Sequence, residues 1–234
     1  MPLKTSINYS PNFNQKKRSK KEIKFIIIHY TGMKSEKAAI DRLTNVQSQV
    51  SSHYFISKNG NITLLVPELY IAWHAGKSKW KGKSLLNRNS IGIEMTNPGH
   101  KFGYVNFTNK QINSTVILIK NLMNKYKIHK KNILGHSDIA PDRKKDPGEK
   151  FPWEYFAKKK LSIWHNIKQQ ELKNLRKKKC NKIEKYRFSR NLIKIGYLGK
   201  NLVKVTEAFQ RRFRPQMVDG QIDQECLKIS KKLI

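Results

Sequence analysis

The stretch IKFIIIHY, residues 23–30, decides the fold of this chain. It is a continuous apolar run, rich in β-branched isoleucine, that ends in His29 and Tyr30. A run of this kind predicts a strand buried on both faces, at the centre of a sheet with helices around it. A histidine at the carboxyl end of such a strand lies at the sheet edge, where α/β proteins form their sites. His29 is therefore the first candidate site residue.

Strand and helix patterns are intermixed along the rest of the chain. We expect further strands at residues 52–57, 61–66, 70–75, 90–95 and 132–136. Asn59–Gly60, between the first two, is the strongest short-range hairpin signal. Helical spacing follows Ser35, a candidate cap, and covers 108–128, whereas residues 76–89 are expected to form a loop. The mixture predicts an α/β fold, with a central mixed β-sheet flanked by helices.

The two ends of the chain differ in composition from the middle. Residues 158–190 hold 13 lysines and arginines but only two acidic residues. An apolar stripe from Leu161 to Leu175 predicts a helix within this basic segment, and the spacing beyond it fits three short helices. The sequence thus predicts four parts: a polar, extended N-terminal arm (1–22), a main domain (23–165), a basic helix or linker (166–182) and a small C-terminal helical domain (183–234).

The net charge of +33 and the pI near 10.2 predict attraction to polyanions such as nucleic acid, anionic lipid or an acidic cell wall. A compositional bias is the alternative, since Asn, Ile and Lys are all abundant, as in proteins from AT-rich genomes. The chain holds no nucleic-acid reading motif, so we expect no specific nucleic-acid partner.

Two cysteines, Cys180 and Cys226, lack metal-ligand spacing, and the sequence leaves open whether they pair. The first 24 residues lack the apolar core of roughly 7–15 residues that a signal peptide needs. No stretch approaches the roughly 18 apolar residues of a membrane span. We therefore expect a soluble chain without a transmembrane segment, in the cytoplasm or in the periplasm and cell envelope.

The segment GHSDIAPDRKKDPG, residues 135–148, is irregular because it holds two prolines and two glycines. It places His136 near its start and Asp146 near its end. Together with His29, these side chains offer two neutral imidazoles and one carboxylate, which suits zinc with a fourth position open to water. The alternative is that His29 is a hydrogen-bonded core histidine and His136 a turn residue.

Five motifs occur in a fixed order: FIIIHYTG, SSHYFISKNGNITLLVPE, AWHAGKSKWKG, NSIGIEMTNPG and GHSDIAPDRKKDPGEKFPW. In this combination, residues 22–165 resemble the zinc-dependent N-acetylmuramoyl-L-alanine amidases of the amidase-2 class, of the AmpD and AmiD type, which are related to peptidoglycan recognition proteins. The resemblance implies a bacterial enzyme with one Zn²⁺ per chain. Such an enzyme hydrolyses the amide between N-acetylmuramic acid and L-alanine in peptidoglycan or muropeptides, anhydro-muropeptides included, during cell-wall turnover or recycling.

Carried over residue by residue, the resemblance implies three zinc ligands: His29, His136 and Asp146. Glu94 matches the general acid/base position, where a carboxylate can take a proton from water and give one to the leaving amine. By strand alternation it shares a face with Gly92, which predicts open space beside it. Lys144 matches the second catalytic position, where a cation can stabilise an oxyanion. The structural alternatives are an outward-facing strand residue for Glu94 and an ordinary surface lysine for Lys144.

Three further residues are predicted to contact the substrate: Trp73, His74 and Arg143. They lie in the motif stretches and suit a pocket that combines apolar and polar groups. We expect His53 to be structural, and Asp138 and Asp142 to stabilise the 135–148 segment as side-chain caps.

The alternative function is a non-catalytic peptidoglycan-binding or recognition protein. Binders of this superfamily commonly lose a zinc ligand, and here every ligand and helper position is filled, which favours the enzyme. The stretch VTEAFQRRFRPQMVDGQID resembles the helical peptidoglycan-binding module of AmiD-type enzymes. We therefore expect a wall-binding C-terminal domain whose removal leaves the cleavage of small muropeptides nearly intact.

Overall fold

The computed structural model describes residues 5–234, and a six-stranded mixed sheet is its main element. In spatial order the strands are β1 (Thr5–Ile7), β5 (Ile62–Leu64), β4 (Tyr54–Ile56), β9 (Ser90–Met95), β3 (Phe25–Tyr30) and β10 (Ile133–Gly135). β3 lies between β9 and β10 and runs parallel to both, which confirms the predicted buried strand. β4 and β5 form the predicted antiparallel hairpin, and Gly60 in its turn has a φ of +81°.

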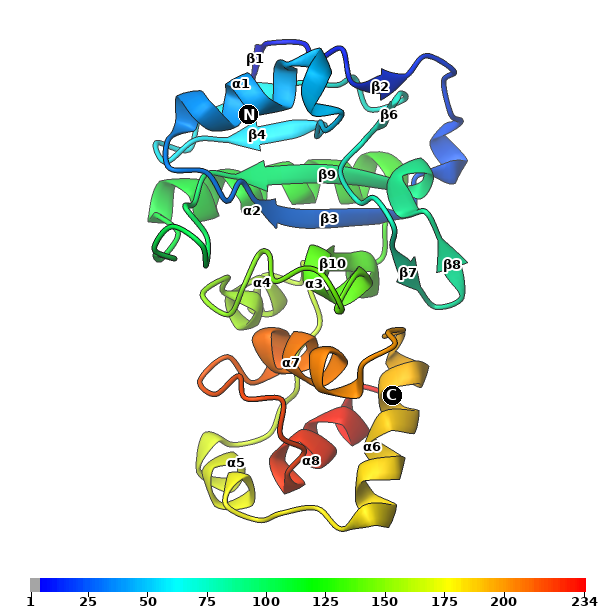
Figure 1. Cartoon of the computed structure of the whole chain (residues 1–234), viewed down its shortest axis with the longest axis vertical. Helices are drawn as coiled ribbons and strands as arrows, with labels where there is room; N and C mark the ends of the chain where they lie inside the picture. Colours follow the sequence, from blue (N-terminus) through cyan, green and yellow to red (C-terminus); the bar gives the residue numbers. More distant parts are fainter. Residues whose placement is uncertain (1–4) are drawn as a thin grey trace.

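Alternation along β3 divides its side chains between two hydrophobic layers. Ile26 and Ile28 belong to the layer beneath α2 (Asn109–Tyr126), together with α4 (Trp153–Lys158). α2 begins where predicted, because the Thr108 side chain accepts a hydrogen bond from Gln111 N. One face of the sheet is therefore closed by helices (Figure 1).

The opposite face of the sheet is covered in two separate places. α1 (Glu36–Thr44), capped by Ser35 as predicted, packs over Phe55 of β4. Phe25 and Ile27 of β3 pack instead against the C-terminal helices. Between these two covers, the carboxyl ends of β3 and β9 remain open, and this gap is where the candidate site forms.

The predicted extended arm is wrong for residues 5–22, because this segment is integrated into the fold. β1 pairs with β5, and β2 (Phe13–Asn14) pairs with β6 (Ile71–Ala72) in a small separate sheet. Arg18 is buried and donates to the carbonyls of Glu68, Asn87 and Arg88. Residues 1–4 lie outside the described residues. The strand predicted at 70–75 is reduced to β6.

Residues 76–89, predicted to be a loop, form regular structure. β7 (Lys79–Trp80) and β8 (Lys83–Ser84) pair as a short hairpin, and a 3₁₀ turn, η3 (Leu86–Asn89), follows. Lys81 and Gly82 at the hairpin turn both have positive φ values. Strands of two residues carry too little alternation to be recognised in a sequence. The remaining short elements are η1 (Lys20–Glu22), η2 (Val46–Ser48), η4 (Lys130–Asn132) and α3 (His136–Ile139).

The basic segment is not one helix along its apolar stripe. α4 ends at Lys158, and the next regular element is α5 (Gln169–Arg176). Lys160 interrupts the helix with a φ of +62°, in the left-handed region. Leu161 packs in the layer beneath α2, whereas Leu172 packs with the C-terminal helices. The stripe therefore serves two different hydrophobic clusters.

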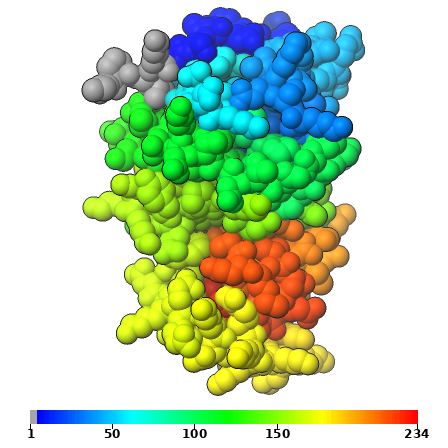
Figure 2. Space-filling model, turned by 90° about the vertical axis from the view of Figure 1, so that its left-hand side faces the viewer, coloured from blue at the N-terminus to red at the C-terminus, as the bar shows by residue number. Residues whose placement is uncertain are grey.

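The C-terminal region, residues 166–234, contains the three predicted helices, α6 (Lys182–Ile195), α7 (Leu202–Phe213) and α8 (Gln224–Lys232). Phe188 and Phe209 of these helices share one cluster with Phe25, Ile27 and Leu134 of the sheet. Its surface meets that of the main domain without a gap on the face shown in Figure 2. Such a shared core argues against the expectation that removal of the C-terminal domain leaves the cleavage of small muropeptides nearly intact.

Cys180 and Cys226 are both buried free thiols, and burial raises the pKa of each. Among residues 5–234, no helix combines the length and the apolar character that crossing a membrane requires.

Candidate metal centre and active site

Two neighbouring parallel strands and one loop bring three candidate ligands together. His29 lies near the end of β3, and His136 follows β10 as the first residue of α3. β10 pairs with β3 so that Gly135 lies opposite Ile28, which places the two histidines side by side. Asp146 returns from the 135–148 segment, and its carbonyl accepts a hydrogen bond from Ser137 N. The three ligand atoms lie within 4.8 Å of one another.

The distances among these atoms fit a metal site. His29 Nδ1 lies 2.9 Å from His136 Nδ1, and each nitrogen lies 3.0 Å from Asp146 Oδ2. Tetrahedral ligands at zinc distances of about 2.0–2.2 Å are roughly 3.3–3.5 Å apart, so little adjustment would be needed. The predicted convergence of these three residues is present.

A chain of hydrogen bonds fixes which nitrogen of His29 is free. The Ser90 hydroxyl donates to Leu86 O at 2.7 Å, so its oxygen can accept from His74 Nε2 at 3.1 Å. His74 Nδ1 then accepts from His29 Nε2 at 3.0 Å. This leaves the Nδ1 lone pair of His29 directed at the other two ligands, as a metal requires.

His136 is oriented in the same way by a backbone carbonyl. Its Nε2 lies 3.2 Å from Ala75 O, which can only accept, and 3.3 Å from Arg143 Nη2, whose shorter contacts are to the carbonyls of Ala75 and Lys77. Donation to Ala75 O therefore places the proton on Nε2 and the lone pair on Nδ1. Arg143 reaches the same carbonyl with Nη2 at 2.5 Å and also donates to Lys77 O. Arg143 thereby fixes the wall behind His136 while it lines the pocket.

The charge states also suit a cation. Burial, and then the neighbouring His136, lowers the pKa of His29 to about 4, so its imidazole is neutral at physiological pH. Burial alone would raise the pKa of Asp146, but His136 and His29 outweigh it and hold that pKa far below its usual range. The site therefore offers the neutral imidazole of His29 and the ionised carboxylate of Asp146, with His136 as the third ligand, a donor set that zinc accepts.

Glu94 lies on β9 directly opposite His29 of β3 and lines the same pocket. Its Oε2 is shielded from solvent, and it has no hydrogen-bond partner among residues 5–234. Burial, and then the negative charge of Asp146, raises the pKa of Glu94 to about 8. The predicted open space at Gly92 is wrong, because a Cβ there would lie 2.5 Å from the His74 ring. Gly92 instead makes room for the side chain that orients His29.

The pocket around these residues has a volume of about 750 Å³, and its rim is cationic. Five lysines and arginines line it: Arg42, Lys101, Arg143, Lys144 and Lys145. Lys144 is partly buried, whereas Lys145 is exposed. The positive charge of Lys144 adds to the lowering of the His29 pKa and opposes the rise of the Glu94 pKa. The two adjacent lysines therefore differ in burial and in their electrostatic effect on the reacting groups, and the catalytic role of Lys144 stays a prediction.

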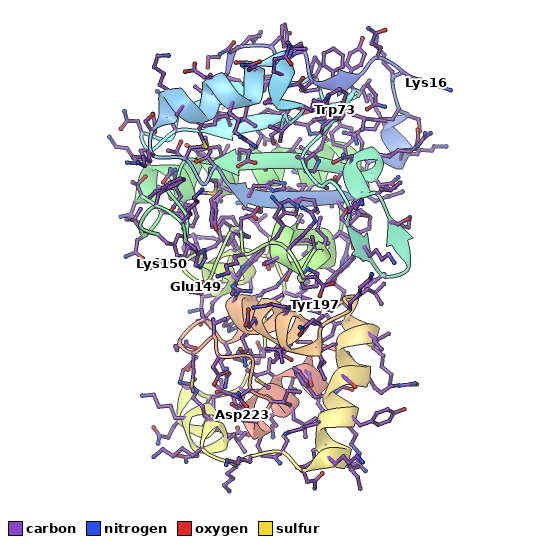
Figure 3. The ribbon with its side chains drawn as sticks, viewed as in Figure 1. Lys16, Trp73, Glu149, Lys150, Tyr197 and Asp223 are labelled. Carbon is purple, nitrogen blue, oxygen red and sulfur yellow. The ribbon has the colours of Figure 1, made fainter. Side chains whose placement is uncertain are left out.

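The remaining predicted residues occupy different positions. His74 is buried behind His29, and both of its nitrogens have partners within the chain. Trp73 does not line the pocket; its indole nitrogen donates to Asn14 Oδ1 near β2 (Figure 3). His53 is fully buried, with Nδ1 accepting from Gly92 N. The roles of Trp73 and His74 as substrate contacts remain predictions.

Sequence reasoning missed a second hydrogen-bonded chain at the pocket. Tyr30 OH lies 2.9 Å from His100 Nδ1, and His100 Nε2 lies 3.1 Å from Glu149 Oε2. Tyr30 and His100 line the pocket. Tyr30 directly follows the ligand His29, and that adjacency was the available signal. His100 lies in the loop after β9, where nothing in its polar surroundings indicated a site.

The 135–148 segment also has a side that faces away from the metal centre. Asp138 accepts from Tyr197 OH at 2.6 Å and from Arg212 Nη1 at 2.5 Å, and both partners belong to the C-terminal region, where Figure 3 labels Tyr197. Asp142 accepts from the backbone nitrogens of Lys200 and Asn201. Asp138 does cap locally, through Gly135 N, but the two aspartates chiefly connect the segment to the C-terminal helices.

A pocket that joins converging imidazole and carboxylate lone pairs to an unpartnered glutamate defines a metal-dependent hydrolase. The chain belongs to the N-acetylmuramoyl-L-alanine amidase family, Amidase_2, which its residues 19–149 match. It is 33% identical over 230 residues to the N-acetylmuramoyl-L-alanine amidase AmiD of Escherichia coli, covering 91% of this chain and 82% of AmiD. It is also 33% identical to the AmpD amidase of Haemophilus influenzae, over 63% of this chain and 87% of that protein.

Solved structures agree over nearly the whole chain. The complex of Escherichia coli AmiD with anhydro-N-acetylmuramic acid-L-Ala-D-γ-Glu-L-Lys matches with a TM-score of 0.80 and 32% identity, covering 94% of this chain and 91% of AmiD. AmpDh3 of Pseudomonas aeruginosa matches with a TM-score of 0.79 and 28% identity, covering 95% of each chain. The predicted fold class, family and enzyme class are thereby confirmed, and these relatives are bacterial.

Proposed function

We propose that the protein is a zinc-dependent amidase that hydrolyses the amide between N-acetylmuramic acid and the L-alanine of the stem peptide. One observation carries the proposal: the free lone pairs of His29, His136 and Asp146 converge beside the unpartnered carboxyl of Glu94. A binding protein has no need of a shielded carboxyl with a raised pKa next to a metal site, whereas general acid/base catalysis does.

The residues divide the chemistry among them. Bound by His29, His136 and Asp146, one zinc ion would supply a Lewis acid for the scissile carbonyl and for water. Glu94 would take the proton of the attacking water and deliver it to the leaving amine, because a pKa near 8 allows exchange close to neutral pH. Lys144 would stabilise the oxyanion of the tetrahedral intermediate.

The rim of the pocket supports an anionic substrate. Five cations surround it, while its only acidic side chains are Glu94 and Asp146. The ligand in the AmiD complex, anhydro-N-acetylmuramic acid-L-Ala-D-γ-Glu-L-Lys, is a muropeptide, and muropeptides carry carboxylates. We infer that muropeptides, anhydro forms included, are substrates here, in wall turnover or recycling; both the cytoplasm and the envelope are compatible with such a role.

The chemistry can be tested with metal analysis and muropeptide cleavage on the same preparations. Wild-type protein is expected to hold about one zinc per chain. His29→Ala is expected to lose both zinc and activity. Glu94→Gln is expected to keep zinc and lose on the order of 10²-fold or more in rate. Zinc affinity is expected to fall as pH falls, because protons compete for the imidazoles.

A matched pair of variants tests the assignment of Lys144. Lys144→Ala is expected to lose about 10²-fold in rate, as for removal of one oxyanion donor. Lys145→Ala, which removes the adjacent exposed lysine of the rim, serves as the control and is expected to weaken substrate binding at most, with kcat near that of the wild type. Full zinc content and full activity in His29→Ala, or equal rates for the two lysine variants, would refute the respective assignment.

We also propose that the C-terminal region contacts polymeric peptidoglycan through α6. Its outer surface exposes Ile183, Tyr186 and Ile193, with exposed fractions of 64%, 61% and 56%. Exposed Lys182 and Lys185 add charge that would attract an anionic wall. These side chains are exposed, on the side of α6 opposite its core residues such as Phe188, so substitutions of them are expected to leave the fold intact.

Sacculus pull-down of the Lys182→Ala/Lys185→Ala double variant tests this contact. Retention is expected to fall at low salt and to approach wild type at high salt, because exposed charges more than about 10 Å apart are screened at 0.1 M. Cleavage of a small muropeptide is the control and should not change. Unaltered retention at every salt concentration would leave α6 without a wall-binding role.

A further inference from the structure

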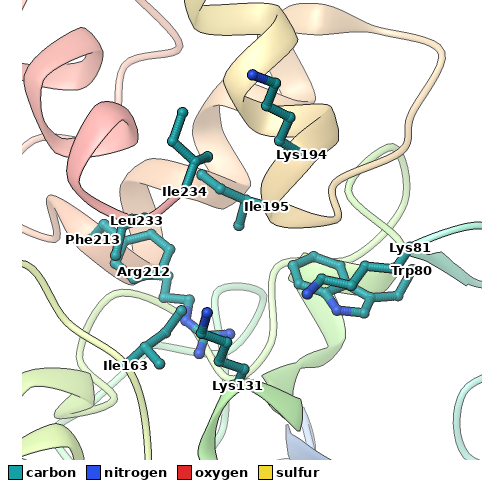
Figure 4. A pocket seen from close by; sticks show the side chains of 10 residues that line it. All are labelled: Trp80, Lys81, Lys131, Ile163, Lys194, Ile195, Arg212, Phe213, Leu233 and Ile234. Carbon is teal, nitrogen blue, oxygen red and sulfur yellow. The ribbon is translucent and has the colours of Figure 1, made fainter.

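A second cavity, of about 520 Å³, lies between the main domain and the C-terminal region and shares no lining residue with the metal pocket. Its lining residues come from both parts of the chain: Trp80, Lys81, Lys131, Ile163, Lys194, Ile195, Arg212, Phe213, Leu233 and Ile234. Figure 4 shows Trp80 and Lys81 on one side, with Arg212, Lys131 and Ile163 across from them.

The cavity is strongly cationic. Four of its lining side chains are lysines or arginines, and no aspartate or glutamate is among them. Within residues 5–234, Lys81, Lys131 and Lys194 form no ion pair. Positive charges that converge on one partly enclosed space attract an anion, because low-dielectric walls screen them less than bulk water does.

Two of the lining residues, Trp80 and Arg212, each have a buried N–H group without an acceptor. Arg212 is 2% exposed; it donates from Nη1 to Asp138 and from Nη2 to Ile133 O, but its Nε has no partner. Trp80 is also 2% exposed, and its indole Nε1 has no partner either. Buried polar groups are nearly always satisfied in native proteins, so two orphaned N–H groups beside one cavity indicate a missing acceptor.

The rest of the cavity wall is apolar. Five aliphatic or aromatic side chains form it: Ile163, Ile195, Phe213, Leu233 and Ile234. A bare inorganic anion would leave this surface unused. A ligand that matches both parts of the wall carries an acceptor anion at one end and a small apolar body at the other.

We propose that this cavity binds a carboxylate carried on a short apolar body, as at the carboxyl end of a peptide. The carboxylate accepts from Trp80 Nε1 and lies among the three lysines, while Arg212 contributes its positive charge from the opposite side of the cavity. The apolar body contacts Phe213 and its neighbours. Because the walls come from both parts of the chain, binding stabilises their association and raises the melting temperature.

The test uses the ¹⁵N-labelled full chain and follows indole N–H signals by NMR, with Trp80→Phe assigning the Trp80 signal. The probe is N-acetyl-alanyl-alanine. It is expected to shift the Trp80 signal saturably, whereas its C-terminal amide is not. The Lys131→Ala/Lys194→Ala double variant is expected to bind at least about tenfold more weakly, because charge-assisted hydrogen bonds are lost. Lys110→Ala/Lys120→Ala, which removes two exposed lysines of α2 outside the cavity, is the charge-matched control.

Several results would overturn the proposal. Equal shifts from the amide, or wild-type binding by the double lysine variant, would exclude a carboxylate site. Binding of inorganic phosphate as tight as that of the dipeptide would reduce the cavity to an adventitious anion site, since the apolar wall would then contribute nothing. These readouts measure binding and do not require amidase activity, so they are independent of the proposed function.

Two sources could supply such a carboxylate: free peptides, and stem peptides still attached to the wall polymer. Sacculus pull-down of the Lys131→Ala/Lys194→Ala variant distinguishes them. Retention below that of the Lys110→Ala/Lys120→Ala control identifies attached peptides as the ligand. Unchanged retention, with dipeptide binding lost, identifies free peptides.

Discussion

Asp138 and Asp146 lie on the same 135–148 segment and are both buried, yet their surroundings are opposite. Every close partner of Asp138 is a donor: Gly135 N, Tyr197 OH and Arg212 Nη1. Asp146 Oδ2 instead faces two imidazole nitrogens whose own protons are committed elsewhere. A carboxylate surrounded by donors is complete within the chain. One that meets only lone pairs requires a cation from outside.

The comparison shows how one short segment supports both chemistry and architecture. The side with Asp146 is incomplete until a metal binds, whereas the side with Asp138 is complete only when the C-terminal helices are in place. The first side should therefore control activity with little effect on the fold. The side with Asp138 should control the stability of the fold, and it should affect activity only when the fold is destabilised.

Removal of a ligand should have the largest effect and only on the metal side. His136→Ala is expected to lose bound zinc and on the order of 10³-fold or more in rate, since the Lewis acid goes with the metal. The fold should survive, because the Asp138 pairs on the same turn are unchanged. Zinc analysis, muropeptide cleavage and circular dichroism check this. An unfolded variant would contradict the claim that the side with Asp146 controls activity with little effect on the fold.

Removal of the cation on the other side should destabilise the whole protein. Arg212→Met leaves Asp138 buried without its charged partner, which costs about 3–5 kcal/mol in unfolding free energy. Denaturant unfolding measures the loss. Asp138→Asn/Arg212→Met, which removes both charges, is the matched control and should recover part of it. A loss below about 1 kcal/mol for the single variant would mean that the buried pair contributes little.

Substitution behind the ligands should sharpen the comparison by weakening zinc binding alone. Ser90→Ala removes the acceptor for His74 Nε2, so His74 no longer holds His29 in one tautomer. Zinc affinity is expected to fall about tenfold, the lower end for outer-shell partners of metal ligands. Competition with a chelator measures the affinity. Wild-type affinity would show that the backbone alone orients His29.

The smallest effect is expected at Asp142, on the edge of the same segment. Asp142→Ala removes acceptors for Lys200 N and Asn201 N, which are exposed to solvent. Water replaces the lost oxygens, so the unfolding free energy should fall by only about 1 kcal/mol. Thermal unfolding beside Lys145→Ala, an adjacent exposed control, measures it. A loss as large as that of Arg212→Met would contradict the distinction between buried and exposed anchoring.

The fold and the metal centre were largely predictable because their signals are local. The apolar run of residues 23–30, the Asn59–Gly60 turn and the Thr108 cap each determine a nearby structure. His29 and His136 follow predicted strands, and parallel strands bring their carboxyl ends to one edge. To predict the three metal ligands, only the order of the strands in the sheet had to be known in addition to the sequence.

The contacts that failed to be predicted join residues far apart in the chain. Asp138 gave no sign of Tyr197 and Arg212, because a buried arginine and a surface arginine look alike in a sequence this basic. Gly92 predicted open space beside Glu94, whereas the structure shows the ring of His74, a residue distant in the sequence, packed against Gly92. The integrated arm depends on Arg18, whose acceptors are backbone carbonyls and leave no side-chain pattern.

The anchoring of Asp138 has a consequence for biosynthesis. Its two partners in the C-terminal region are separated from it by 59 and 74 residues in the chain. During translation, the turn that carries His136 is made well before the side chains that hold it from behind. A nascent chain that has emerged only as far as α4 therefore has all three metal ligands but lacks Tyr197 and Arg212, the partners of Asp138. Stable binding of the metal should therefore follow the emergence of α7 from the ribosome. Maturation of the enzyme would then depend on synthesis of the last third of the chain.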